Sequence, residues 1–211
     1  MISHFDADHC NGLIAILENI KIENLIISKQ ASICKEYENI MKIVKKKKIA
    51  VKVVEKGDKV IVDKLVYLDI LHPDKQLTND NKGGLNVNSI VAKVYYKQKN
   101  NRNFRILFTG DIEEDAENIV IKKEDINLEA EILKIAHHGS KTSSTDGFLE
   151  KVKPRIALIG VGEKNTFGHP NDIVLKRLSS RGVKIYRTDL HGEIILKINR
   201  NGKVFVNTMI E

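Results

Sequence analysis

The sequence begins with four side chains that can bind divalent metals, all within the segment His4-Phe5-Asp6-Ala7-Asp8-His9. Imidazole and carboxylate groups are the ligands that zinc, manganese and iron accept in proteins. Carboxylates brought together without a cation repel one another, and a metal supplies the missing charge. The alternative is a polar strand-to-helix turn with Asp8 near the helix N-terminus. The density of ligands favours metal binding: His4 and Asp6 face the same way on an extended strand end and could share one ion, while Asp8 and His9 could serve a second.

A second group of polar side chains follows a predicted strand in the segment His137-His138-Gly139-Ser140. If that strand continues through the two histidines, their side chains point to opposite sides. We therefore expect one to bind metal and the other to orient substrate or carry protons, and we favour His137 as the ligand. Aligning the strand end differently exchanges the two roles. Ser140 is expected either to hydrogen-bond a ligand or a substrate oxygen, or to cap the next segment.

Four segments in series resemble motifs of one family. His4 to Leu13 resembles the His-x-His-x-Asp-His signature of the metallo-β-lactamase superfamily, most closely the version in its ComEC-like subgroup, typified by the C-terminal domain of competence proteins. The segments 107–111 (Leu-Phe-Thr-Gly-Asp), 134–140 (Lys-Ile-Ala-His-His-Gly-Ser) and 161–170 (Val-Gly-Glu-Lys-Asn-Thr-Phe-Gly-His-Pro) look like the later motifs of that subgroup, in the usual order. The resemblance covers almost the whole chain.

This resemblance implies an αββα sandwich and a hydrolase that uses a water activated by two divalent ions, Zn or Mn. The expected metal ligands are His4, Asp6, Asp8, His9, Asp111 and His137, with Asp111 bridging the two ions. The expected catalytic residues are Asp8, His138 and His169. The expected substrate-binding residues are Asn88, Ser89, Ser140 and His169. The resemblance favours His169 as a phosphate contact or general acid, and the alternative is a loop histidine without a role.

The sequence departs from the family pattern in two places. Asp6 replaces the usual second histidine, as it does elsewhere in the ComEC-like subgroup, and Asn88 and Ser89 stand where a third histidine is customary. The first metal position is therefore rich in oxygen ligands, which favours manganese as an alternative to zinc. The chain also lacks the strands that usually precede the first motif. We therefore expect one sheet to expose an unpaired edge and an apolar face. We also expect the chain to be a truncated domain, to have a misassigned start, or to be one half of a split or associating protein.

The remaining sequence predicts an α/β layered protein forming one domain over residues 1–211. The expected strands are 1–3, 24–28, 51–54, 60–71, 86–97, 104–109, 131–136, 155–160, 183–187, 194–199 and 203–207. The expected helices are 11–20, 31–48, 113–122, 146–152 and 171–181. Turns are expected at Gly57-Asp58, making a hairpin or meander, and at Asn100-Asn101 and Asn201-Gly202, with an exposed loop over 74–85.

Composition adds weaker constraints. The net charge is +7 and the pI about 9.2, which is compatible with nucleic acid or another phosphodiester as partner. The Lys45-Lys46-Lys47-Lys48 run is more typical of a solvated helix end than of a nucleic-acid patch. The sequence contains no apolar stretch long enough for a membrane span and no secretion signal, so we expect a soluble cytoplasmic protein. Cys10 is expected to be a buried structural residue, and the two cysteines form no disulfide pattern.

These features together predict a metal-dependent hydrolase, with phosphodiester or nucleic-acid substrates favoured over lactams and thioesters. The sequence has no Gly-x-Ser-x-Gly elbow and no phosphate-binding loop, in agreement with a reaction that needs no protein nucleophile. The main alternative is a module that keeps the ligand loops and binds a partner without catalysis. An unrelated α/β hydrolase is the remaining possibility.

Overall fold

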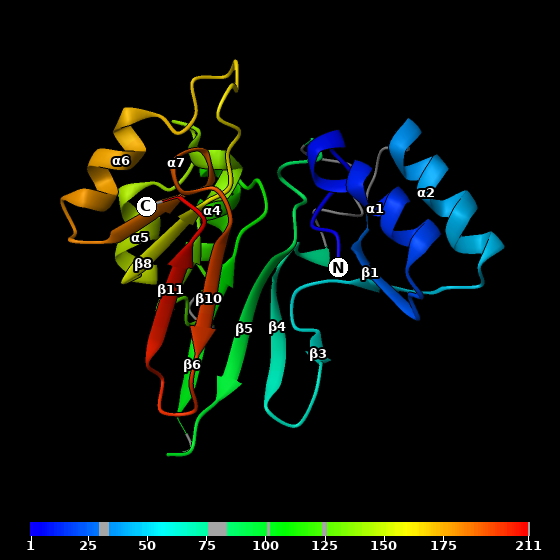
Figure 1. Cartoon of the computed structure of the whole chain (residues 1–211), viewed down its shortest axis with the longest axis horizontal. Helices are drawn as coiled ribbons and strands as arrows, with labels where there is room; N and C mark the ends of the chain where they lie inside the picture. The colour runs from blue at the N-terminus through cyan, green and yellow to red at the C-terminus, as the bar shows by residue number, and fades with distance from the viewer. Residues whose placement is uncertain (30–33, 76–83, 101, 124–125, 211) are drawn as a thin grey trace.

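The computed structural model describes residues 1–29, 34–75, 84–100, 102–123 and 126–210. Its centre is a mixed sheet of seven strands in the order β3-β4-β5-β6-β7-β8-β9 (Figure 1). The strands are β3 (Lys59–Ile61), β4 (Val66–His72), β5 (Val91–Lys97), β6 (Asn103–Phe108), β7 (Ile132–Lys134), β8 (Ile156–Ile159) and β9 (Lys184–Arg187). The pairs from β3 to β6 are antiparallel, and those from β6 to β9 are parallel. The parallel strands end at one edge, where their loops can form a site.

One face of this sheet is covered by α4 (Glu114–Ile121), α5 (Asp146–Val152) and α6 (Asp172–Ser179). The core between them is closely packed: Leu133 of the sheet and Phe148 and Val174 of the helices are fully buried. Fully burying side chains of this size contributes about 1.5–3 kcal/mol each before conformational entropy is subtracted. This half of the fold rigidly positions the loops that follow β6, β7 and β8.

A second set of layers packs on the opposite face. The helices α1 (Ala7–Asn19) and α2 (Lys35–Lys46) cover a parallel pair formed by β1 (Asn24–Ser28) and β2 (Ala50–Val54). Val54 of β2 and Ile26 of β1 pack against Ile70 of β4 and Ala92 of β5, so the two sheets lie face to face. The chain closes with the short helix α7 (Thr188–His191) and an antiparallel hairpin of β10 (Ile194–Ile198) and β11 (Val204–Thr208). The predicted helix-sheet-sheet-helix architecture is confirmed.

Several local predictions are confirmed closely. The strand over 24–28 and the helix over 146–152 have the predicted bounds, and Cys10 is fully buried. The helix predicted over 31–48 is observed as α2, which ends at Lys46 inside the lysine run, although 31–33 lie outside the described residues. Residues 76–83 of the predicted loop and Asn101 of the predicted turn also lie outside them.

Other predictions are wrong, mainly where pairing is decided by distant residues. Residues 1–3 form no strand, although the amide of Ile2 donates to the carbonyl of Ile26 at 2.9 Å. The strands β2 and β3 do not form a hairpin around Gly57-Asp58, because β2 pairs with β1 and β3 pairs with β4. The predicted strand 86–97 begins only at Val91, and the helix predicted from Asn11 begins at Ala7.

Some strand edges are apolar and exposed, as expected. Val53 of β2 is 51% exposed and Ile61 of β3 is 74% exposed. Association with another chain stays a prediction. None of the described helices combines the length and the apolar character that crossing a bilayer requires.

Candidate metal centre and active site

The carboxyl ends of β6 and β7 and the first turn of α1 meet at one edge of the large sheet. Asp111 follows β6, and His138 follows β7 in the short 3-10 segment η1 (Ala136–Gly139). Asp8 and His9 lie in the first turn of α1, which begins before the predicted helix start at Asn11. Three segments far apart in the sequence therefore deliver these four side chains to one place.

The four side chains place two carboxylate oxygens and two imidazole nitrogens within 4.8 Å of one another. His9 Nε2 lies 3.1 Å from Asp111 Oδ2, and His138 Nε2 lies 3.0 Å from Asp8 Oδ2. The two imidazole nitrogens are 3.3 Å apart. Ligand atoms held 2.0–2.2 Å from a tetrahedral ion lie about 3.3–3.6 Å from each other. The donor set and its spacing thus fit a single divalent cation.

The backbone fixes which nitrogen of His138 faces this cluster. Its Nδ1 lies 2.6 Å from the carbonyl oxygen of Gly160, which follows β8 and can only accept a hydrogen bond. Nδ1 must therefore carry the proton, and in a neutral ring Nε2 has a free lone pair directed at the cluster. A carbonyl that orients a histidine in this way is common at metal sites.

The electrostatics of the cluster favour a bound positive charge. Burial alone would raise the pKa of Asp111, but hydrogen bonds from His138 and His9 hold that pKa far below its usual range. The same hydrogen bond to Asp111 raises the pKa of His138. The Asp111 carboxylate is 5% exposed, and its Oδ1 has no hydrogen-bond partner among the described residues. A buried anion with an unused oxygen is a strong position for a cation.

A tight turn aims Asp111 at the cluster. Gly110 has a φ of +54°, and a Cβ at that position would lie 2.8 Å from Cβ of Ser89, so a larger residue would clash there. The hydroxyl of Thr109 donates to the carbonyl of Lys134 at 2.7 Å, which joins this turn to β7. The amide of Asp111 donates to Ser89 Oγ at 3.2 Å. This geometry requires glycine at the position before Asp111.

His4 and Asp6 form a second candidate position beside the first. His4 is fully buried, and its Nδ1 lies 3.1 Å from the hydroxyl oxygens of both Ser3 and Ser89. Its Nε2 lies 3.5 Å from Asp6 Oδ2 and has no hydrogen bond within the described residues. Burial, aided by His9, lowers the pKa of His4 to about 4, so this imidazole is neutral and able to bind metal at pH 7. These two side chains offer one nitrogen and two carboxylate oxygens.

The geometry favours His138 as the metal ligand of the histidine pair, where we had expected His137. His138 lies in the four-residue cluster, whereas His137 Nδ1 lies 3.3 Å from Glu113 Oε1. The physical reason is that the strand does not continue through the pair. Both residues have positive φ values, 47° and 52°, which turns the backbone and sends the second ring toward the cluster.

A cavity of about 320 Å³ opens beside the cluster, lined by Asp8, His138 and the loop that follows β8. Asn165 braces this loop, because its side chain donates to the carbonyl of His169 at 2.8 Å and accepts from the amide of the same residue at 3.0 Å. The ring of His169 lies 5.7 Å from that of His137, and its Nδ1 is buried without a partner among the described residues. Phe167 stands on the rim and is 80% exposed.

The residues predicted to bind substrate are placed differently from one another. His169 lines the cavity, but Ser89 is fully buried and supports His4 and Asp111, so it cannot touch substrate. Asn88 is also buried, and the Ser140 hydroxyl lies 2.8 Å from that of Thr142, within its own turn. The correction for Ser89 follows from its position beneath the ligands.

Some residues of the site were missed by the sequence analysis. Gly160 acts through its backbone carbonyl, which leaves no signal in the side chain pattern. Glu113 and Ser3 were not singled out either. Asn165 and Phe167 lie inside the motif 161–170 and could have been found there as polar and aromatic residues of a loop that borders a site.

No model of a known protein family matches the chain. The solved structure of isothiocyanate hydrolase from Delia radicum gut bacteria aligns with a TM-score of 0.50 and 10% identity, over 98% of this chain and 75% of that one, a likeness of fold alone. ComE operon protein 3 of Bacillus subtilis (strain 168) is 27% identical over 194 residues. Competence protein ComA of Neisseria gonorrhoeae is 32% identical over 137 residues, 65% of this chain. The chain is a homologue of the ComEC-type competence proteins and has the metallo-β-lactamase fold.

The chain spans only part of the length of these relatives. The alignments cover 92% of the chain but 24% of ComE operon protein 3, and 18% of ComA. The family resemblance seen in the sequence is thus confirmed by homology. The activities of the much longer relatives concern those proteins as wholes.

Proposed function

We propose that this ComEC-type chain is a metal-dependent hydrolase that cleaves phosphodiesters, with a nucleic-acid strand as the preferred substrate. The observation that carries the proposal is the convergence of Asp8, His9, Asp111 and His138, whose ligand atoms come from three distant segments and lie within 4.8 Å. A structural role does not require two imidazole nitrogens 3.3 Å apart beside two carboxylates.

We infer that these four residues hold one divalent cation and that His4 and Asp6, with the second oxygen of Asp111, hold another. A cation held there supplies Lewis-acid activation of a water molecule and of the phosphoryl oxygen. The first position, with two imidazoles, suits zinc, and the second, richer in oxygen, suits manganese as well.

The protein residues around the cations orient the reactants. The carbonyl of Gly160 keeps the Nε2 lone pair of His138 directed at the cluster. His137 and His169 lie at the cavity beside it, and Glu113 contacts His137. Burial, together with the neighbouring His137, lowers the pKa of His169, which keeps this ring neutral. A neutral imidazole in this position can hydrogen-bond a phosphoryl oxygen, and it would first have to take up a proton to act as the general acid for the departing oxygen.

Two features support phosphodiesters as the substrate class. The net charge of +7 favours the approach of polyanions. The exposed ring of Phe167 on the cavity rim offers a surface on which a base can stack, an interaction worth about 1–3 kcal/mol per base. Lactam and thioester substrates offer neither a polyanionic backbone nor bases.

The test is turnover by purified protein loaded with Zn²⁺ or Mn²⁺, using bis-p-nitrophenyl phosphate and a labelled single-stranded oligonucleotide. We expect hydrolysis of both that is lost on chelation and in Asp111→Asn. The matched control is Asp115→Asn, the same change at an exposed position of α4. Stoichiometric metal binding by folded protein without any turnover would overturn the hydrolase proposal and favour a non-catalytic binding module.

A further inference from the structure

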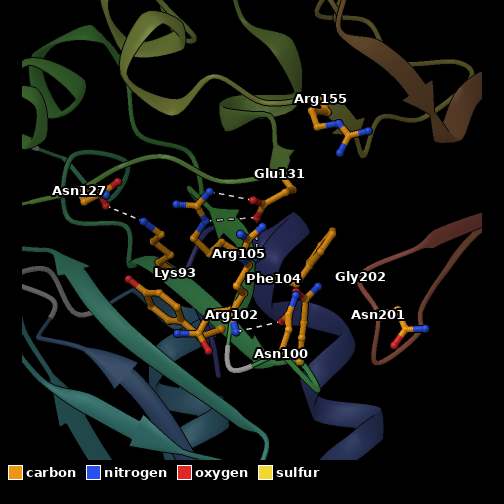
Figure 2. A pocket seen from close by; sticks show the side chains of 13 residues that line it. Lys93, Asn100, Arg102, Phe104, Arg105, Asn127, Glu131, Arg155, Asn201 and Gly202 are labelled. Atoms are coloured by element: carbon orange, nitrogen blue, oxygen red, sulfur yellow. Dashed lines mark hydrogen bonds and ion pairs between the residues drawn. The ribbon is translucent and has the colours of Figure 1, made fainter.

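A second polar cavity lies at the opposite end of the large sheet from the metal centre. It has a volume of about 620 Å³ and lies between the β5–β6 end of the sheet and the turn of the β10–β11 hairpin. Figure 2 shows the side chains that line it. Glu131 and Arg155 of its lining directly precede β7 and β8, whereas the metal centre lies beyond the carboxyl ends of these strands. We call this cavity the distal groove. None of the residues assigned to the metal centre lines it.

The distal groove carries an excess of positive charge. Its lining contains four cations, Lys93, Arg102, Arg105 and Arg155, and one acid, Glu131. The acid is committed to one of the cations, because Arg105 Nη2 lies 2.7 Å from Glu131 Oε1 and Arg105 Nε lies 3.3 Å from Oε2 (Figure 2). Three of the four cations therefore have no counter-charge within the groove lining.

Two of these cations are free to bind a ligand. The guanidinium groups of Arg102 and Arg155 are exposed and make no hydrogen bond or ion pair with any residue in the described ranges. In Figure 2 Arg155 stands apart from the Arg105–Glu131 pair, across the cavity from Arg102. A guanidinium offers five donors in a planar fork that matches the oxygens of a phosphate group.

The third cation is buried at the base of the groove. Lys93 is 1% exposed, and its Nζ donates to the backbone carbonyl of Asn127 at 2.7 Å and lies 5.4 Å from the ring centroid of Tyr95. An ammonium group has three donors, and one neutral acceptor does not compensate a buried charge. An anion that enters the groove would supply the missing counter-charge.

The hairpin gives the groove a fixed wall. The amide of Lys99, just after β5, donates to the carbonyl of Arg200 at 3.0 Å. Gly202 has a φ of +80°, which favours glycine, and it lies against the side chain of Gln98, the residue after β5. The groove is therefore formed by packing between two turns and is not a gap left by loose loops.

The groove continues beneath the hairpin. A second cavity of about 390 Å³ shares Arg155, Glu131 and Gly202 with it and adds two more cations, Lys184 and Lys203. The combined lining holds six cations and one acid. Side-chain amides, including Asn103 and Asn201, supply neutral hydrogen-bonding groups between the charges.

We propose that the distal groove binds the phosphate backbone of a single-stranded nucleic acid, at a site separate from the metal centre. A series of cations along an elongated channel fits a chain of phosphates better than a single anion, which would use only part of it. The side-chain amides of the lining can hydrogen-bond exposed bases, as single strands present them. This inference goes beyond the proposed hydrolase activity, because binding there needs no metal.

The experiment measures fluorescence anisotropy of a labelled oligo-dT 20-mer with the full chain in the presence of a chelator, so that a failure of the hydrolase proposal does not affect the result. The groove variant is Arg102→Glu with Arg155→Glu. The control variant is Lys52→Glu with Lys151→Glu, which makes the same change in net charge at exposed positions on β2 and α5. All four positions are exposed, and urea midpoints verify that both variants fold.

We expect the groove variant to bind at least about tenfold more weakly than the native chain, and the control to bind within about threefold of it. Two lost phosphate contacts should also reduce the slope of log K against log salt by about 1.4, since each contributes about 0.7 for single strands. Equal weakening in both variants would overturn the proposal in favour of general charge attraction. The proposal would also be overturned if the native chain did not bind the oligonucleotide or if it bound a duplex equally well. Binding of inorganic phosphate without binding of the oligonucleotide would overturn it too.

Discussion

The substitution Asp111→Asn tests the metal centre in a way that does not depend on turnover. It replaces a carboxylate that lies 3.1 Å from His9 Nε2 and 3.4 Å from His138 Nε2 with a neutral side chain of nearly the same shape. Removal of a group that merely orients a ligand weakens metal binding about 10–100-fold. Loss of a direct carboxylate ligand should therefore weaken it by at least about 100-fold, or about 2.8 kcal/mol.

This loss can be read as a change in metal-induced stabilisation. Zinc at 1,000 times its Kd stabilises the folded protein by about 4.1 kcal/mol, and a 100-fold weaker site gains only about 1.4 kcal/mol at the same concentration. For a chain of this size, the difference corresponds to about 5–11 °C in Tm. The assay compares the Tm of each protein with and without Zn²⁺, so that any effect of the substitution on the metal-free protein cancels.

Asp115→Asn is the control, because it makes the same chemical change on the exposed surface of α4. Its metal-induced increase in Tm should equal that of the native chain. An equal increase in Asp111→Asn would refute the assignment of Asp111 as a ligand and, with it, the electrostatic argument for the cluster.

Three further predictions concern other parts of the molecule. His138→Ala should abolish tight zinc binding measured by calorimetry, whereas His137→Ala should retain it; the opposite result would restore the assignment made from the sequence. Gly139→Ala should lower the unfolding free energy measured in urea by about 2 kcal/mol or more, because Gly139 has a φ of +84° and the new Cβ would lie 2.6 Å from a proline side chain. Gly162→Ala is the control and should change the unfolding free energy little, because a Cβ at Gly162 would have no atom within 4 Å. Burial lowers the pKa of Lys93 from 10.5 to about 8, so between these pH values the unfolded chain holds this proton more tightly than the folded chain does. As pH increases from 8 to 10.5, the unfolding free energy of the native chain should therefore rise by up to about 3 kcal/mol relative to that of Lys93→Met. Parallel pH profiles of the two proteins in urea would contradict this.

The parts of the site that were predictable from the sequence are those with a local signal. Asp8 and His9 were identifiable because ligand density is a property of neighbouring residues, and Asp111 because it lies in a segment that resembles a family motif. The preference for His137 over His138 rested on an alternating strand, which the structure does not have at this pair. Two left-handed residues in succession break that alternation, and nothing in the local composition indicates them.

The same distinction holds for the fold. The strand β1 and helix α5 were predicted with the correct bounds because their apolar pattern is local. The pairing partner of β2 was not predicted. Its parallel pairing with β1 depends on how α2, which connects the two strands in the sequence, packs against them. The burial of Lys93 was equally hidden, since a lysine in an alternating strand is normally expected to face water.

The central claim is that residues from three distant segments share one divalent cation. The most direct measurement is anomalous X-ray scattering from crystals of the native chain grown with Zn²⁺ or Mn²⁺. We predict a strong anomalous peak between His9 Nε2, His138 Nε2 and the carboxylates of Asp8 and Asp111. A fully ordered site without such a peak at saturating metal, or a peak bound by His137 instead of His138, would contradict it.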